Sequence, residues 1–137
     1  MAKSIFPQDM LSSSGGELTL ESIAAKLTYF HEQLHLIHWQ TTSYAEHQAI
    51  GGLYDYVHDF KDGLIEKLMG YMNKRPQAYK IEPLTNESSA RTVVENLKQY
   101  ASQLKKFGEM NAYHDVCNLA DALSGEAAKT IYLLTLS

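Results

Sequence analysis

Four stretches of helical periodicity, and no stretch of strand-like alternation, most constrain the fold of this chain. Apolar residues recur at steps of three and four, the pattern of a helix that buries one face. The four runs are Ile23, Leu27, Phe30, Leu34 and Ile37; Ile50, Leu53, Val57, Phe60, Leu64, Leu68 and Tyr71; Val93, Leu97, Tyr100, Leu104 and Phe107; and Val116, Ala120, Leu123, Ala127, Ile131 and Leu134. A chain of 137 residues fits one domain around one core. We therefore predict an all-α bundle of four helices over residues 19–137, preceded by an N-terminal extension over residues 1–18.

Residues suited to helix ends bracket these runs. Thr19 is a candidate N-cap of the first helix, and Ser89 follows Ser88 as a candidate cap of the third. Gly108 suits the left-handed position just beyond the end of the third helix. The fourth helix is expected to start near Asn111, and a glycine inside it, Gly125, costs about 1 kcal/mol relative to alanine. That position is where we expect the fourth helix to bend or to pack closely.

The connections differ in length. Short connections join the first helix to the second and the third to the fourth, which makes each pair antiparallel neighbours. The link between the second and third helices runs from Asn73 to Ser89 and contains Pro76 and Pro83. Fully extended it reaches about 55 Å, whereas the second helix spans about 40 Å. The link can therefore cross the length of the bundle, although a loosely ordered loop in an up-down-up-down bundle would have the same sequence.

Composition narrows the class of function. No apolar run approaches the roughly 20 residues that span a bilayer, and the N-terminus lacks a signal-peptide pattern, so we expect a soluble, cytoplasmic protein with no membrane association.

The lone Cys117 excludes an internal disulfide and a Cys-rich zinc site. A net charge of −4 and scattered basic pairs predict weak or absent DNA binding.

Histidines and carboxylates gather on two helix edges. On a helical wheel, His31, His35 and His38 lie about 75° from the apolar stripe of the first helix. The second helix carries a matching polar strip of His47, Asp55, His58, Asp62 and Glu66. Both strips are expected to be half-buried at a seam between helices or subunits. Imidazole and carboxylate ligands suit iron, zinc or manganese, although each residue taken alone is compatible with a partly solvated position beside a core.

Known sequence motifs for di-iron, zinc-protease and phosphate sites are incomplete or missing in this chain. Glu32 and His35 form a Glu-x-x-His unit, which builds di-iron sites when two helices each supply one copy. The chain has a single copy. It has no Gly-rich phosphate loop and no His-Glu-x-x-His motif.

The chain contains, in this order, His38-Trp39, His47 and Asp62-x-x-x-Glu66, with Asp62 fifteen residues after His47. This series of motifs resembles the signature of the DNA-protection-during-starvation (Dps) branch of the ferritin-like superfamily. The resemblance implies a four-helix ferritin-like bundle with one long crossover between helices two and three. It also implies a homo-oligomer, a two-fold dimer or a dodecameric shell, with a role in stress protection.

The same resemblance implies a ferroxidase centre shared between subunits. His38 and His47 of one subunit, with Asp62 and Glu66 of its partner, would bind and oxidise Fe(II); zinc or manganese are alternative ions. His35, Asp55 and His58 are additional candidate ligands, and Trp39 and His35 would orient the site. Two departures, a short segment between His38 and His47 and Gly51 at a position where the family has an acidic ligand, favour an alternative. In it, the chain is a ferritin-fold structural or interaction protein with an inactive metal site, so enzyme activity stays an open question.

Overall fold

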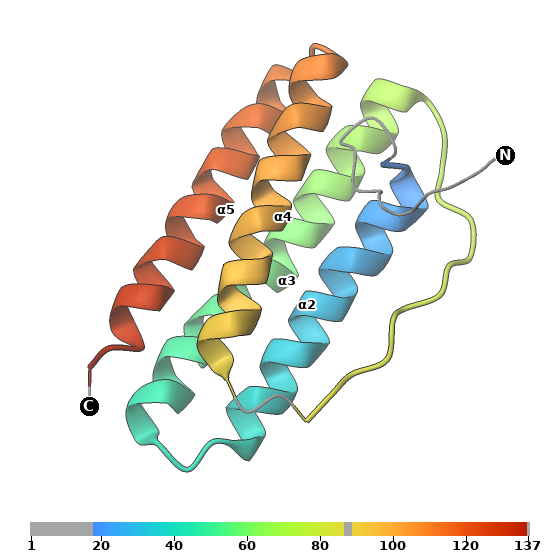
Figure 1. The fold of residues 1–137 in the computed structure, drawn as a ribbon. Coiled ribbons are helices and arrows are strands. Elements are labelled where there is room, and N and C mark those ends of the chain that lie inside the picture. Colours follow the sequence, from blue (N-terminus) through green and yellow to red (C-terminus); the bar gives the residue numbers. More distant parts are fainter. Residues whose placement is uncertain (1–17, 87–88, 137) are drawn as a thin grey trace, which may run out of the picture.

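The computed structural model describes residues 18–86 and 89–136 and is all-helical over this range (Figure 1). Its helices are α2 (Leu20–Gln40), α3 (Tyr44–Met72), α4 (Ala90–Met110) and α5 (His114–Leu133). The predicted four-helix bundle is confirmed. Of the predicted N-terminal extension, all but Leu18 lies outside the described residues. None of the four helices is both long and apolar enough to cross a membrane.

The apolar stripes meet in one core. Helix α2 packs beside α3 and α4 beside α5, while α3 also contacts α5 and α2 contacts α4. The largest fully buried side chains include Leu27, Leu34, Leu64, Leu104 and Leu123, drawn from all four helices. The predicted core residue Tyr71 instead lies at the surface, 44% exposed, where its ring stacks on Tyr113 at 4.2 Å.

The N-terminal caps of α2 and α4 are those expected from the sequence, whereas the end of α4 differs. Thr19 caps α2 in a reciprocal capping box with Ser22, and Ser89 caps α4; Ser88 lies outside the described residues. The predicted end of the third helix at Gly108 is wrong. Helix α4 continues through Gly108 to Met110. A Cβ at Gly108 would lie 2.9 Å from the sulfur of Cys117 on α5. Gly108 thus permits a close helix contact.

The close packing expected at Gly125 is also wrong. A Cβ at Gly125 would meet no other atom within 4 Å, and the residue lies on the exposed side of α5. The fourth helix begins at His114, later than expected, because Ala112 takes a left-handed conformation with φ 58° and turns the chain just before it.

The link between α3 and α4 runs along α2 from its first turn to its last. Four contacts fix this path, in order along α2: Glu21 with the backbone of Gln77 (2.7 Å), Lys26 with Glu82 (2.9 Å), Gln33 with Thr85 (2.8 and 2.9 Å), and Gln40 with Asn86 (2.9 Å). The link therefore crosses from one end of the bundle to the other, and Figure 1 shows α3 and α4 starting at the same end.

Candidate functional site

Histidines line the outer seam between α2 and α3. His31, His35 and His38 project from α2, and His47 and His58 from α3. The residues of α2 recur at steps of three and four, so they share one edge of that helix. The three α2 histidines and His47 are half-buried, as the wheel predicts. His58 is exposed, so the expectation that it is half-buried is wrong.

His38 and His47 face each other across the short turn between the helices. The Nδ1 of His38 lies 2.8 Å from the carbonyl oxygen of His47, and the Nδ1 of His47 lies 2.9 Å from the carbonyl oxygen of His38. The rings stack with centroids 3.6 Å apart and planes 19° apart. The short connection therefore draws the two histidines into a reciprocal pair.

This pairing sets the chemistry of both rings. A carbonyl oxygen only accepts hydrogen bonds, so each Nδ1 carries the proton. In the neutral ring the lone pair then sits on Nε2, the arrangement found in histidines that bind metals. Both side chains are therefore oriented as nitrogen donors before any ion arrives.

The stacking also limits how the pair can bind. A metal ion lies in the plane of the imidazole that binds it, about 2.1 Å from the nitrogen. Two nearly parallel rings 3.6 Å apart do not direct their lone pairs to one point. His38 and His47 are therefore suited to two neighbouring ions, or to one ion after a ring rotates.

Gly51 has a structural role beside this pair. A Cβ at position 51 would lie 3.0 Å from Cε1 and 3.2 Å from Nδ1 of His38. The glycine lets the His38 ring lie against the backbone of α3. At this position the chain makes room for an imidazole.

The carboxylates of the predicted site lie elsewhere on α3. Asp62 is fifteen residues from His47 on one continuous helix, roughly 22 Å away at 1.5 Å per residue, and Glu66 is a turn further. Asp55, Asp62 and Glu66 are exposed, so the expectation that they are half-buried is wrong. At 100° per residue they lie further from the apolar stripe of α3 than His47 does. Within residues 18–86 and 89–136, no three His, Cys, Asp or Glu side chains come together closely enough for a metal. One chain does not bring His38, His47, Asp62 and Glu66 together.

An aromatic stack occupies the middle of the seam. The centroid of the His35 ring lies 3.9 Å from that of Trp39, with the planes tilted, and 4.4 Å from that of Tyr54, on which it stacks. Tyr54 also meets the rings of His31 and His38 at 5.6 and 5.1 Å. Trp39 contacts His35 and remains 66% exposed. In the sequence, Tyr54 is marked only by its place one helical turn before His58, which does not indicate this central position.

His31 and His58 form a second pair across the seam. Their ring centroids are 5.3 Å apart, and Nδ1 of His31 lies 3.1 Å from the carboxylate of Glu32. Burial lowers the pKa of His31; Glu32 opposes this shift, and neighbouring His58 and His35 add to it. Burial at the seam therefore favours the neutral form of the His31 ring.

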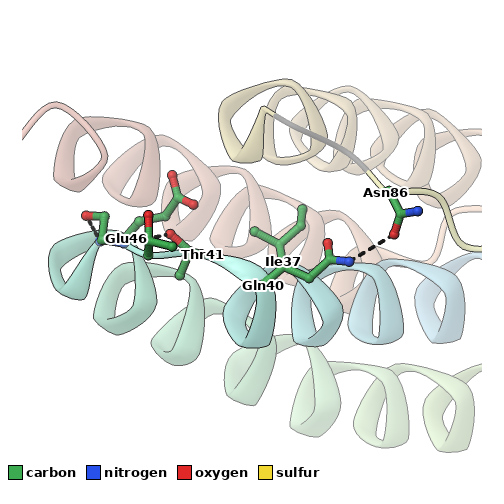
Figure 2. A pocket seen from close by; sticks show the side chains of 7 residues that line it. Ile37, Gln40, Thr41, Glu46 and Asn86 are labelled. Atoms are coloured by element: carbon green, nitrogen blue, oxygen red, sulfur yellow. Dashed lines mark hydrogen bonds between the residues drawn. The ribbon is translucent and has the colours of Figure 1, made fainter.

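A hollow of about 570 Å³ opens beside the turn between α2 and α3 (Figure 2). Its walls include Gln40, Thr41, Ser43, Glu46 and Asn86, and Figure 2 shows the hydrogen bond from Gln40 to Asn86. None of the predicted metal ligands lines it.

The described residues thus define an all-helical bundle whose outer α2/α3 seam carries paired histidines. The chain belongs to DUF5856, a family of unknown function whose model matches residues 38–134. The matched region contains the His38/His47 pair, His58 and both carboxylates of the predicted site. No curated protein matches the chain.

Proposed function

We propose that this protein is a Dps-like member of the ferritin-like superfamily that binds and oxidises Fe(II) at a site shared by two chains. The observation that carries the proposal is the reciprocal pair of His38 and His47, whose Nδ1 atoms are held by carbonyl oxygens. Both Nε2 atoms are thereby left for metal binding. The link that crosses the bundle along α2 is the connection expected of a ferritin-like bundle.

The distance along α3 supports a shared site. Because Asp62 and Glu66 lie roughly 22 Å and more from His47 on a straight helix, they can join the histidines only from a second chain. A two-fold axis places the same residues of each chain opposite the other set and so creates two sites per dimer. Nitrogen donors from one chain and hard carboxylate donors from the other suit iron.

The reaction balances with hydrogen peroxide as oxidant. Two Fe(II) ions give up one electron each, and peroxide takes both electrons and two protons to become two water molecules. The anionic side chains of Asp62 and Glu66 stabilise the higher charge of the ferric product. The histidine pair, suited to two neighbouring ions, matches the two electrons that peroxide requires.

Complementation between variants tests the shared site. His47→Ala and Asp62→Ala should each abolish Fe(II) oxidation by peroxide, since each removes one of few ligands from both sites of a dimer. Co-expressed, the two variants form mixed dimers in which one site keeps every ligand. Random pairing makes half the dimers mixed, so about a quarter of the wild-type activity should return. Activity of either variant alone at the wild-type level, or no recovery from an active wild type, would overturn the shared site.

A second function, a ferritin-fold structural or interaction protein without iron chemistry, is favoured by one observation. Gly51 accommodates the His38 ring and itself supplies no carboxylate. A folded protein gains stability from any ion that binds only its folded state, about 2.7 kcal/mol at a hundred times the dissociation constant. If Fe(II) does not raise the melting temperature of the wild-type protein, and the protein does not oxidise Fe(II), the structural or interaction function is the correct one.

A further inference from the structure

The proposed iron site does not use the second histidine pair of the seam, His31 and His58. His31 lies on α2 and His58 on α3, and their ring centroids are 5.3 Å apart with planes 49° apart. Both belong to the same chain, so their spacing does not depend on a partner subunit.

This spacing fits two imidazoles on one ion. A metal sits about 2.1 Å from each nitrogen and so about 3.2 Å from each ring centre, which puts the centres about 5.3 Å apart at a tetrahedral angle. The His31–His58 spacing has this value. The stacked His38–His47 rings, at 3.6 Å, do not.

His31 is also oriented for binding. Its Nδ1 contacts the Glu32 carboxylate at 3.1 Å, and a carboxylate accepts the proton-bearing nitrogen, which leaves the lone pair on Nε2. A carboxylate behind a histidine is the arrangement that fixes ligand histidines in metal sites and strengthens their basicity.

His35 is the nearest further histidine, 5.8 Å from His31 between ring centroids. Its ring contacts that of Trp39 and stacks on that of Tyr54, so turning it toward an ion would cost both contacts. An ion between His31 and His58 would therefore have two protein ligands, with water in its remaining coordination positions.

We propose that His31 and His58 form a bis-imidazole binding site for a borderline divalent cation, represented by Zn²⁺, within a single chain. The site does not depend on the proposed iron chemistry. Its affinity is independent of protein concentration, whereas a site shared by two chains weakens as the dimer dissociates.

Zinc titration of the metal-free full chain tests the site, followed by calorimetry and by NMR of the assigned imidazole signals. The His31 and His58 signals should shift together. His58→Gln, at an exposed position, should weaken zinc binding by more than about tenfold, and Glu32→Ala by about tenfold, the cost of losing an orienting partner. His31→Gln should act as His58→Gln does.

Two controls separate this site from others. His114→Gln removes the histidine that opens α5 and should leave zinc affinity unchanged. Asp62→Asn with Glu66→Gln disables the proposed iron site and should also leave it unchanged. Zinc that shifts only the His38 and His47 signals, or that binds His58→Gln as tightly as wild type, would overturn the proposal.

Discussion

At the scale of single residues, the two adjacent glycines of α3 differ in their surroundings. A Cβ at Gly51 would press on the His38 ring at 3.0 Å, whereas one at Gly52 would meet nothing within 4 Å. Gly52→Ala should raise the free energy of unfolding by about 1 kcal/mol, the helix-propensity gain of alanine over glycine. Gly51→Ala should gain less, because its methyl group displaces His38. Urea unfolding of the two variants measures the difference.

Position 51 also bears on metal binding. Gly51→Asp adds a carboxylate, but its Cβ displaces the ring that would share the ion. We therefore expect it to weaken metal binding at His38, measured by calorimetry with Zn²⁺, with Gly52→Asp as the matched control. Tighter binding by Gly51→Asp alone would mean that the His38 ring moves aside at little cost.

At the scale of elements, the link depends on Gln33. This side chain is fully buried, and its amide both donates to the Thr85 carbonyl and accepts from the Thr85 N–H. Gln33→Ala should lower the free energy of unfolding by about 1–3 kcal/mol, since it removes a buried, fully satisfied group. It should also speed exchange of the Thr85 amide proton.

Gln40 supplies the matched control, because it bonds Asn86 at the surface. Gln40→Ala should change the free energy of unfolding by no more than about 0.5 kcal/mol. If Gln33→Ala and Gln40→Ala lower the free energy of unfolding equally, the link is held by contacts along its whole length and not mainly by the buried amide of Gln33.

At the scale of the whole molecule, the seam carries exposed aromatic side chains at the α2–α3 end. Trp39 is 66% and Tyr44 is 75% exposed. A two-fold dimer over the seam would cover them, so sedimentation should give at least twice the 15.4 kDa chain mass. Trp39 is the single tryptophan, and its emission should shift to the red on dilution. A 15.4 kDa species at micromolar concentration would contradict the dimer and the shared iron site with it.

The sequence by itself determined the helices and the edges that carry the histidines, because burial imposes a period of 3.6 that can be read from Leu27 or Leu64 without coordinates. Only the tertiary structure decided what these residues contact. The pairing of His38 with His47, the ring space at Gly51 and the helix contact at Gly108 depend on how closely two backbones approach. Gly108 has the same sequence signal as a helix end, and its neighbour Cys117 on another helix decides between the two roles. Local periodicity carries no information on such distances, since they are set by packing between elements far apart in the chain.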